Sequence, residues 1–430
     1  MHRTHYIKEA RKATQGTVRI AGWVHDVRDL GKMKFVLVRD ISGIMQVIMK
    51  KGAVPDELLE AVRVNKEDVV AFEGTVKENK MAPEGVELVP TAFEHLNRVE
   101  RKLPVDPTGV VPSEMDTRLD HRYLDLRRKE PSLIFRAKAV AAGAFRDKLR
   151  DLGFMEIHPS AITGAATEGG ADVFQIQYFE NKAFLVQSPQ LYKQLAVIGG
   201  MDRVMMCVPV FRAEKHNTTT HLNEITQMDI EMGFADHNDA MDVLEKVTLH
   251  ILGTVRKELG SEIETLWGPV IVPERIPRYT YTDLVSKLND NGFEMKHGWD
   301  FTKEAEKKLH DILGEELYFI YDWPTDVRAF YSMPDQKTPE ICHAFDLMYR
   351  GLEISSGAKR IHLPAMLEEQ LKRRGLDPVS FEFYIGAFRM GAPPHAGWSI
   401  GLERLIMKLC KQENIRECML FPRDRTRLLP

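Results

Sequence analysis

The sequence has little of what marks membrane-bound, secreted or zinc-knuckle proteins. No apolar run approaches the roughly 18 residues that a membrane-spanning helix needs, and the first residues carry no apolar signal core. We therefore expect a protein that stays in the cytoplasm. The four cysteines are scattered and form no CxxC pair, so we expect reduced thiols and neither a disulfide framework nor a zinc knuckle.

An excess of positive charge is also missing. The formal net charge is −4 over 430 residues, of which 43% are hydrophobic and 28% charged, as in soluble globular proteins. A strongly basic chain would indicate a nucleic-acid partner, but a local patch on an acidic protein can bind phosphates, so the net charge neither supports nor excludes RNA. The length exceeds that of one hydrophobic core and predicts two or three domains.

Five short β runs and one helical stretch occupy the N-terminal part of the chain. Gly-containing turns separate the runs, and the order of three strands, a helix and two strands fits a small Greek-key barrel of the OB type. An unrelated small barrel without a ligand is the alternative. The runs cover residues 18–24, 35–40, 44–48, 68–76 and 86–89, and the helix lies near 55–64.

A proline-rich stretch at residues 103–117 marks the best domain boundary. After it, residues 132–152 show the periodicity of a long helix, and the remainder alternates strands and helices without a regular βαβ beat. We therefore predict an α+β fold, in which the OB barrel precedes a domain built on an antiparallel sheet flanked by helices. The predicted parts are residues 1–103 (barrel), 104–131 (hinge) and 132–430 (second domain, with an insertion at about 260–334).

A polar loop at residues 215–220, between the segments 211–214 and 221–224, predicts a β-hairpin with an overlong tip. Arg212 and Glu214 are two apart, so on a strand their side chains share one face. The functional interpretation has Arg212 on a phosphate and Glu214 accepting from an adenine amino group. The alternative is a surface ion pair worth less than ~1 kcal/mol.

Asp346 and Glu353 form a second cluster. One straight strand would place them on opposite faces, but a hairpin turning near Arg350 and Gly351 brings them opposite each other on one face. Two such carboxylates repel unless a cation lies between them, and Mg²⁺ takes one or two carboxylates plus substrate phosphates. Two unrelated solvent carboxylates are the alternative.

Arg404 belongs to a third cluster. The apolar residues from Leu402 to Leu409 follow the spacing of an amphipathic helix that begins after Gly401. Arg404 then lies in the first turn, where the helix dipole already favours an anion. An exposed helix charge is the alternative.

Together these segments resemble the class II aminoacyl-tRNA synthetases. Pro159 with the helix before it, the hairpin at 211–231 and the run 401–404 look like motifs 1, 2 and 3 of that family, in the right order and at the right spacing. With the barrel, the resemblance covers essentially the whole chain and points to the subgroup that loads aspartate, asparagine or lysine. It implies an enzyme that activates an amino acid with ATP and Mg²⁺, loads it onto tRNA and forms a symmetric homodimer.

Within that subgroup, the resemblance favours the archaeal-type enzymes that use L-aspartate. Residues 167–171 look like a flexible loop that closes on the amino acid, and residues 187–194 look like the aspartate-recognition helix. Lys193 and Arg360 would converge on the side-chain carboxylate, because Arg offers a bidentate fork and an asparagine amide would not need both charges. The implied aspartate-binding set is Glu168, Ser188, Gln190, Lys193, Arg212, Asp229, Ser356 and Arg360.

The resemblance also implies catalysis by positioning and charge stabilisation, without a general base. Arg212 on the α-phosphate, Arg404 on the γ-phosphate and Glu214 on the nucleotide are the implied catalytic residues. Thr220 stands where relatives often have Arg, so either Lys215 substitutes or ATP binds more weakly. The implied ATP-binding set is Arg212, Glu214, His221, Leu222, Glu353, Gly401, Glu403 and Arg404, and the implied Mg²⁺ set is Asp346, Glu353 and Ser356.

The barrel resembles an anticodon reader. Phe35 is placed to stack on an anticodon base and Gln46 to hydrogen-bond one, while Arg28 would contact the stem backbone; a core position for Phe35 is the alternative. His25 and Pro83 match archaeal-type enzymes that aspartylate tRNA-Asn as well as tRNA-Asp, whereas stricter relatives tend to carry Trp and Lys. We therefore predict a non-discriminating enzyme, which requires an amidotransferase that converts Asp-tRNA-Asn.

Four other functions stay open at this stage. One is a discriminating enzyme for tRNA-Asp alone, and another is an asparaginyl-tRNA synthetase. An ammonia-dependent asparagine synthetase shares the catalytic fold but lacks the barrel. An inactive paralogue serving as an RNA-binding module would commonly lose motif arginines, whereas Arg212, Glu353 and Arg404 are all present.

Overall fold

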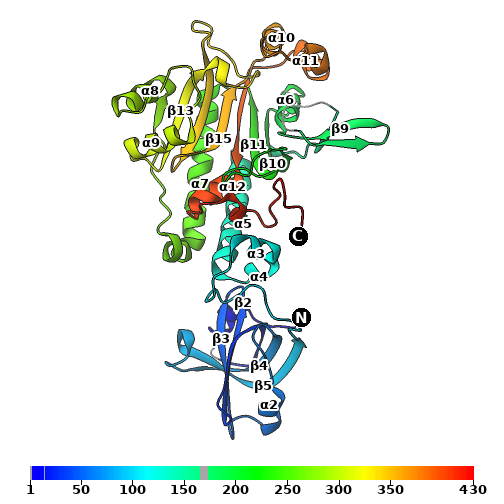
Figure 1. Cartoon of the computed structure of the whole chain (residues 1–430), viewed down its shortest axis with the longest axis vertical. Coiled ribbons are helices and arrows are strands. Elements are labelled where there is room, and N and C mark those ends of the chain that lie inside the picture. Colours follow the sequence, from blue (N-terminus) through cyan, green and yellow to red (C-terminus); the bar gives the residue numbers. More distant parts are fainter. Residues whose placement is uncertain (1, 14, 165–172) are drawn as a thin grey trace. The chain divides into compact units, whose positions relative to one another are not determined.

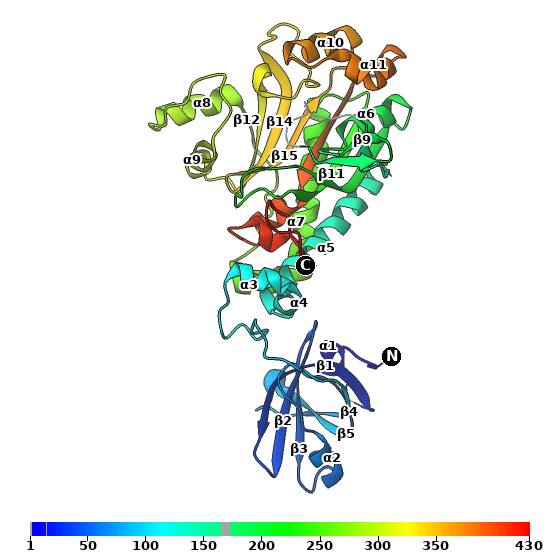
Figure 2. The same cartoon turned by 45° about the vertical axis from the view of Figure 1, so that its right-hand side comes forward.

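The structure, a computed structural model, describes residues 2–13, 15–164 and 173–430 (Figures 1 and 2). The chain divides into two compact units, Met1–Ser132 and Leu133–Pro430, and each is described by itself. Glu168 and the rest of the expected flexible loop, 167–171, lie outside the described residues. Among the helices that the structure describes, none is long and apolar enough to cross a membrane.

The first unit contains a closed barrel in the strand order β1-β2-β3-β5-β4. Buried and exposed positions alternate along β1 and β2, so that Val18, Ile20, Val36 and Val38 fill the interior. β3 pairs in parallel with β5 and closes the barrel, which confirms the predicted OB fold. The elements are α1 (Ile7–Ala10), β1 (Val18–Asp29), β2 (Met33–Asp40), β3 (Gly43–Lys50), α2 (Asp56–Ala61), β4 (Val69–Glu78) and β5 (Val86–Asn97).

Two short helices, α3 (Met115–Asp120) and α4 (Arg122–Asp125), complete the first unit. Asp125 is fully buried and accepts a hydrogen bond from Arg122 at 2.6 Å. Arg127 Nη1 lies 3.0 Å from the carboxylate of Glu67, which is also buried. The interval that the sequence marks as a hinge thus carries buried ion pairs of its own.

The second unit is built on a sheet of eight strands in the order β12-β13-β14-β15-β16-β11-β10-β6. All neighbours are antiparallel except the pairs at the two ends, β12 with β13 and β6 with β10, which are parallel. The expected antiparallel sheet is therefore confirmed for its central strands. The strands are β6 (Met155–Glu156), β10 (Arg203–Phe211), β11 (Glu224–Gly233), β12 (Arg278–Thr280), β13 (Leu317–Pro324), β14 (Ile341–Tyr349), β15 (Leu352–Lys359) and β16 (His395–Gly401).

Two long helices, α5 (Lys129–Asp151) and α7 (His237–Trp267), pack on one face of this sheet (Figure 2). Apolar strand residues such as Ile230 point to that face and share a buried core with both helices. Because side chains alternate along a strand, the neighbouring Asp229 and Glu231 point to the opposite face. That opposite face is where polar groups gather.

The interval 260–334, expected as an insertion, is part of this fold. Its first residues finish α7, and it contributes β12 and β13 to the sheet. The remaining helices are α6 (Gln190–Ile198), α8 (Tyr281–Asp290), α9 (Lys303–Leu313), α10 (Pro364–Arg373), α11 (Glu382–Arg389) and α12 (Leu402–Leu409). A small separate sheet holds β7 (Ile162–Thr163), β8 (Gln175–Tyr178) and β9 (Asn181–Leu185).

Candidate active site

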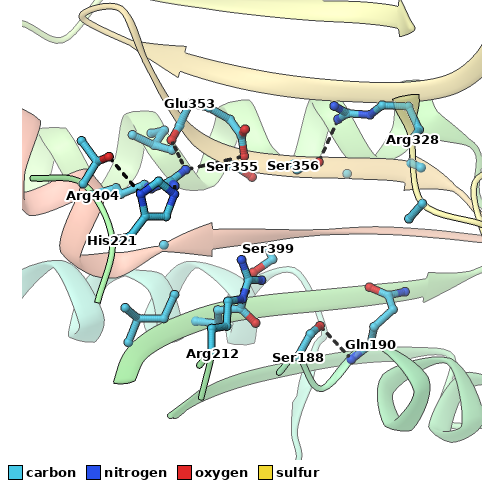
Figure 3. A pocket seen from close by; sticks show the side chains of 18 of the residues that line it. Ser188, Gln190, Arg212, His221, Arg328, Glu353, Ser355, Ser356, Ser399 and Arg404 are labelled. Atoms are coloured by element: carbon cyan, nitrogen blue, oxygen red, sulfur yellow. Dashed lines mark hydrogen bonds and ion pairs between the residues drawn. The ribbon is translucent and has the colours of Figure 1, made fainter. Parts of the chain in front are cut away.

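Two neighbouring cavities, of about 310 Å³ and about 170 Å³, open on the polar face of the sheet. The larger is within the usual range of ligand pockets. Both are lined by Thr220, His221, Glu353 and Arg404, so the two cavities adjoin. Figure 3 shows side chains that line the larger cavity, among them His221, Glu353 and Arg404. The predicted residues that line the larger cavity are Ser188, Gln190, Arg212, Glu214, His221, Leu222, Glu353, Ser356, Arg360, Gly401, Glu403 and Arg404.

Arg212 and Glu214 lie in the loop just beyond β10. Strand pairing ends at Phe211 and Glu224, and the Asn223 side chain then donates to the carbonyl oxygens of Arg212 (2.7 Å) and Glu214 (3.4 Å), which fixes this part of the loop. The expectation that the two side chains share a strand face is therefore wrong. Both nevertheless line the larger cavity, so the loop itself presents them.

His221 is held between Arg404 and a threonine of the same loop. Arg404 Nη2 lies 3.1 Å from His221 Nε2, and since Arg only donates, Nε2 accepts and Nδ1 donates to Thr218 Oγ1 at 2.8 Å. Burial and the nearby charges of Arg404 and Lys303 lower the pKa of His221 to about 4. The ring is therefore neutral near pH 7 and acts as a polar contact.

Asp346 and Glu353 both line the smaller cavity, but the pairing of their two strands differs from the expected one. The turn between their strands has positive φ at Arg350 (47°) and Gly351 (66°), as a tight hairpin turn requires. The turn pairs Glu353 with Met348, and a β-bulge beyond that pair places Asp346 opposite Ser356. The prediction of a directly facing carboxylate pair is wrong, although a single cavity receives both groups.

The carboxylates around the smaller cavity crowd one another. Burial and the charge of Asp346 raise the pKa of Glu353, and burial and the charge of Glu353 raise the pKa of Glu306 to about 8. This crowding disfavours the charged forms and favours a cation among them. With the Ser356 hydroxyl, these oxygen donors suit Mg²⁺, so the residues present fit the predicted ion.

Arg328 is a site residue that sequence reasoning missed. It donates to Ser356 Oγ at 2.9 Å (Figure 3) and forms an ion pair with Asp346, so it binds two of the groups that the sequence assigned to Mg²⁺. Arg328 follows a single irregular turn, 325–327, where no periodicity marks it as functional.

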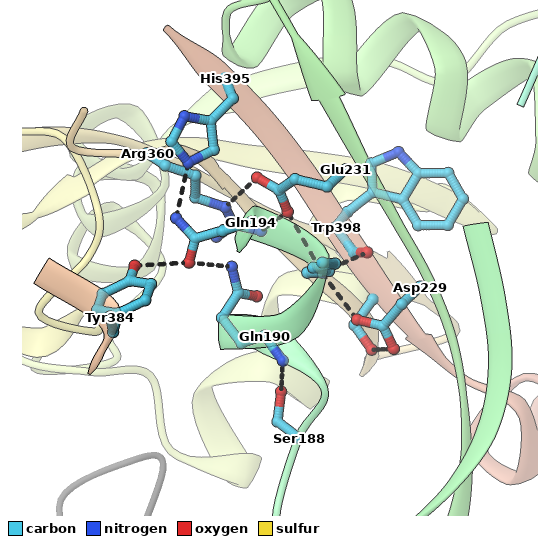
Figure 4. Close-up of polar contacts among 11 residues, drawn as sticks. Ser188, Gln190, Gln194, Asp229, Glu231, Arg360, Tyr384, His395 and Trp398 are labelled. Carbon is cyan, nitrogen blue, oxygen red and sulfur yellow. Dashed lines mark hydrogen bonds and ion pairs between the residues drawn. The ribbon is translucent and has the colours of Figure 1, made fainter. Parts of the chain in front are cut away.

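Two buried ion pairs lie next to the residues that line the larger cavity, and Figure 4 shows the contacts of Asp229, Glu231 and Arg360. Lys193 Nζ is 2.8 Å from Asp229 Oδ1, and Arg360 Nε is 3.0 Å from Glu231 Oε1. Ser399, which the sequence did not indicate, also donates to Asp229 at 3.2 Å. Lys193 and Arg360 were expected to converge on a side-chain carboxylate: Arg360 lines the cavity, whereas Lys193 is fully buried against Asp229 behind the lining residues.

The packing around Glu231 leaves no room for a side chain on the neighbouring strand. A Cβ on Gly397 would lie 2.3 Å from Glu231 Oε2, so glycine is required there. On α6, the Gln190 side chain donates from Nε2 to Gln194 Oε1 at 3.0 Å, and the backbone N–H of Gln190 donates to Ser188 Oγ at 3.2 Å. These bonds fix Gln190 and Ser188 at the cavity wall.

Glu403 was expected to bind ATP, but its carboxylate has other partners. It is buried, and it accepts from Lys138 Nζ at 2.6 Å and from the Thr226 amide at 2.9 Å. Glu403 therefore anchors the start of α12, which begins at Leu402 as predicted and positions Arg404 beside the cavity.

Comparison with known protein families identifies the family to which this chain belongs. The family described as "tRNA synthetases class II (D, K and N)" matches residues 114–425, and an "OB-fold nucleic acid binding domain" matches residues 18–96. The chain belongs to the class II tRNA synthetase family. The resemblance read from the three motifs and the barrel is thereby confirmed.

Relatives of this synthetase match it along its whole length. The aspartate–tRNA(Asp/Asn) ligase of Methanocaldococcus jannaschii is 48% identical, over 100% of this chain and 98% of that protein. The aspartate–tRNA(Asp) ligase of Pyrococcus furiosus is 46% identical over 100% of both. Among solved structures, asparaginyl-tRNA synthetase from Pyrococcus horikoshii with asparaginyl-adenylate matches with a TM-score of 0.93 at 30% identity, covering 99% of each chain.

The motif 2 loop of this synthetase contacts a lysine from α9. Lys303 Nζ donates to Thr220 Oγ1 at 2.9 Å, and Lys303 lines the smaller cavity beside Arg404. Lys215, the replacement considered from the sequence, is not among the described residues that line either cavity. Sequence reasoning missed Lys303 because a lysine in a lysine-rich helix gives no signal.

The barrel of the synthetase presents its predicted anticodon residues on the outer face. Phe35 alternates with the buried Val36, so its interpretation as a core residue is wrong. Arg28 stands opposite Phe35 in the strand register, and its side chain is 77% exposed. Gln46 donates to Glu87 at 2.9 Å.

The two residues expected to set the choice of tRNA also lie on this unit. His25 Nδ1 is 2.9 Å from Arg39 Nη1, and Arg39 also binds the buried Glu67 at 2.7 Å. Burial lowers the pKa of His25, which suits its role as the acceptor. Pro83 is exposed and begins a short turn between β4 and β5.

Proposed function

We propose that this synthetase is an aspartate–tRNA ligase that charges both tRNA-Asp and tRNA-Asn. The observation that carries the proposal is that Arg212, Arg404 and Arg360 line one cavity on the polar face of the sheet. Two arginines for phosphates and one for a side-chain carboxylate are what adenylate formation from an acidic amino acid needs. Full-length relatives named aspartate–tRNA ligases support the same function.

Arg360 favours aspartate over asparagine in this proposal. Its Nε and Nη2 bind Glu231, and a guanidinium has five N–H donors, so three remain for a substrate carboxylate. The buried Lys193 would contribute through Asp229, whose carboxylate it binds and holds in place for the α-ammonium group of the substrate aspartate. The proposed aspartate-binding residues are Glu168, Ser188, Gln190, Lys193, Arg212, Asp229, Ser356 and Arg360.

ATP would bind against the residues that line both cavities. In the first step the α-carboxylate of aspartate attacks the α-phosphate of ATP, which Arg212 would contact. Pyrophosphate then leaves on the side of Arg404. The adenylate then passes its aspartyl group to a ribose hydroxyl at the 3′ end of the tRNA. Glu214, the neutral His221 and Leu222 would place the nucleotide, so catalysis rests on positioning and charge.

We infer that Lys303 supplies the phosphate contact for which Thr220 has no charge. Its ammonium is held by Thr220 Oγ1 beside the residues that line both cavities, close enough to His221 to lower the pKa of that ring. Lys303, Arg212 and Arg404 together would surround the triphosphate.

Mg²⁺ would be held by Asp346, Glu353 and Ser356, whose crowding favours a cation. When bound, the ion neutralises phosphate charge and orients the leaving group. Arg328 contacts Asp346 and Ser356, so it lies directly beside the groups that would hold the ion.

The barrel would determine which tRNAs the enzyme charges. Two relatives of nearly equal identity carry names that differ in tRNA range, so overall identity does not decide it. His25 and Pro83 follow the pattern of the relaxed enzymes, and Arg28, Phe35 and Gln46 offer an outward face for unpaired bases. An amidotransferase that acts on Asp-tRNA-Asn is then a functional partner, and the enzyme is expected in the cytoplasm, where tRNA is charged.

We infer a symmetric homodimer from the motif 1 segment. β6 is the last strand in the sheet order, and its Met155 is 55% exposed. Pro159 follows at the same edge. An exposed edge with an apolar side chain favours pairing with a second copy.

ATP–pyrophosphate exchange tests the amino-acid assignment. We expect aspartate to drive exchange at least ~100-fold more efficiently than asparagine, because an amide leaves a carboxylate-binding Arg unsatisfied. The Arg360→Lys variant keeps a cation beside the buried Glu231 but lacks the guanidinium fork, so it should lose most of the exchange with aspartate while its circular dichroism stays unchanged. Exchange driven by asparagine instead would make the chain an asparaginyl-tRNA synthetase.

A further inference from the structure

Two histidines and a carboxylate come together outside the residues that line the active-site cavities. His237 begins α7, Asp322 lies on β13 and His343 lies on β14. One ligand atom of each lies within 4.8 Å of the other two. The two imidazole rings are stacked, with centroids 4.5 Å apart and planes 10° apart.

The backbone of β13 is bent to bring Asp322 into this cluster. A bulge lies between Tyr321 and Trp323, and Asp322 between them has φ of 58°, a left-handed conformation that a non-glycine residue adopts at a cost. Bulges of this kind redirect a side chain. Here the bulge places the Asp322 carboxylate 3.8 Å from His343 Nδ1.

A second carboxylate lies on the other side of the His343 ring. His343 Nε2 lies 3.3 Å from Asp335 Oδ2, and Asp335 is itself fixed by the backbone amides of Lys337 and Thr338 at 2.9 Å. The ring of His343 thus lies between two carboxylates, with Nε2 toward Asp335 and Nδ1 toward Asp322.

Two ring nitrogens of this cluster have no hydrogen-bond partner. His343 Nδ1 and His237 Nδ1 are both buried atoms without such a partner among the described residues. Two imidazole nitrogens and a carboxylate oxygen are the donor set of Zn²⁺ and similar borderline cations, and a carboxylate behind a ligating histidine is their usual support.

We propose that His237, Asp322 and His343 form a binding site for a borderline divalent cation, with Zn²⁺ as the first candidate and Asp335 orienting His343. A water would complete four-fold coordination. Because the rings of His237 and His343 are stacked, their nitrogens do not point to one common position, so binding of the ion requires one ring to tilt. His343 is 22% and Asp322 34% exposed, which leaves room for that movement and a path for the ion. The site would join the start of α7 to β13 and β14.

The test uses the full-length enzyme, stripped with a chelator, reduced, and saturated with Mg²⁺ to fill the carboxylate site near ATP. Zn²⁺ is titrated by calorimetry, and Co²⁺ by visible absorption. We expect one equivalent bound, a higher melting temperature with Zn²⁺, and a cobalt spectrum without a thiolate band. The His343→Gln variant should bind at least ~10-fold more weakly, as should Asp335→Asn, in line with the effect of supporting carboxylates.

His250→Gln, at a histidine further along α7, the helix that His237 begins, is the matched control and should bind as the wild type does. Aspartate-dependent pyrophosphate exchange should be unchanged in His343→Gln, which also shows that the variant is folded. Binding that His343→Gln leaves intact, a thiolate band with Co²⁺, or no binding to the wild type would each overturn the proposal. None of these results depends on the proposed ligase function.

Discussion

Lys303 Nζ donates a hydrogen bond to Thr220 Oγ1 at 2.9 Å, across 83 residues of sequence. The lysine comes from α9 and the threonine from the motif 2 loop, so two separate segments jointly place a cation beside Arg404. This relationship accounts for a position at which the motif lacks its usual arginine.

Replacing Lys303 should weaken ATP binding. A hydrogen bond to a charged group contributes about 1.5–3 kcal/mol, so we expect Lys303→Met to raise the KM for ATP at least ~10-fold in pyrophosphate exchange, with little change in the KM for aspartate. Lys307→Met, one turn further along α9, is the control. Adding Thr220→Arg to Lys303→Met should restore most of the ATP affinity; no rescue would argue against a shared role.

Glu306 should make the metal-free protein less stable as the pH rises. Its pKa is raised to about 8 in the folded state, by burial and then by Glu353. A carboxyl whose pKa is higher when folded stabilises at low pH, and that contribution is lost between its ordinary pKa and about 8. In chelator, the melting temperature of Glu306→Gln should therefore exceed that of the wild type increasingly from pH 5 to pH 8.5. A constant difference across this range would refute the assignment.

The buried pair of Lys193 and Asp229 should show strong coupling. Removing one partner of a buried pair leaves an uncompensated charge and costs about 3–5 kcal/mol, so Lys193→Met should lower the free energy of unfolding by that order. The double variant with Asp229→Asn should recover much of the loss in chemical denaturation, although it should not recover aspartate activation. If the two effects simply add, the pair does not interact as the structure indicates.

The sequence predicted the fold because its signals are local. The alternation around Val18 and Val36 gives the barrel, and the apolar spacing after Gly401 gives α12. The catalytic segments were recognisable for the same reason, since Arg212, Glu214 and Arg404 each lie within a short run.

Long-range pairing could not be predicted in this way. Arg328 and Lys303 reach the site from segments without a motif, and nothing local indicates that Lys193 binds Asp229 and not a ligand. The bulge that moves Asp346 opposite Ser356 is likewise set by strand pairing that sequence spacing does not reveal.

The tRNA range should depend on His25 and Pro83. His25 accepts from Arg39 on the barrel and Pro83 is exposed, so both can be changed without opening the core. We expect His25→Trp with Pro83→Lys to reduce charging of tRNA-Asn at least ~10-fold, a difference of about 1.4 kcal/mol, and to spare tRNA-Asp. Equal loss on both tRNAs would indicate damage to the barrel and not a change in specificity.

The most direct test of the account is aminoacylation with radiolabelled aspartate, run in parallel on tRNA-Asp and tRNA-Asn transcripts. The account predicts comparable charging of both. Charging of tRNA-Asp alone would contradict the relaxed reading of the anticodon, and charging of neither would contradict the assignment of the active site itself.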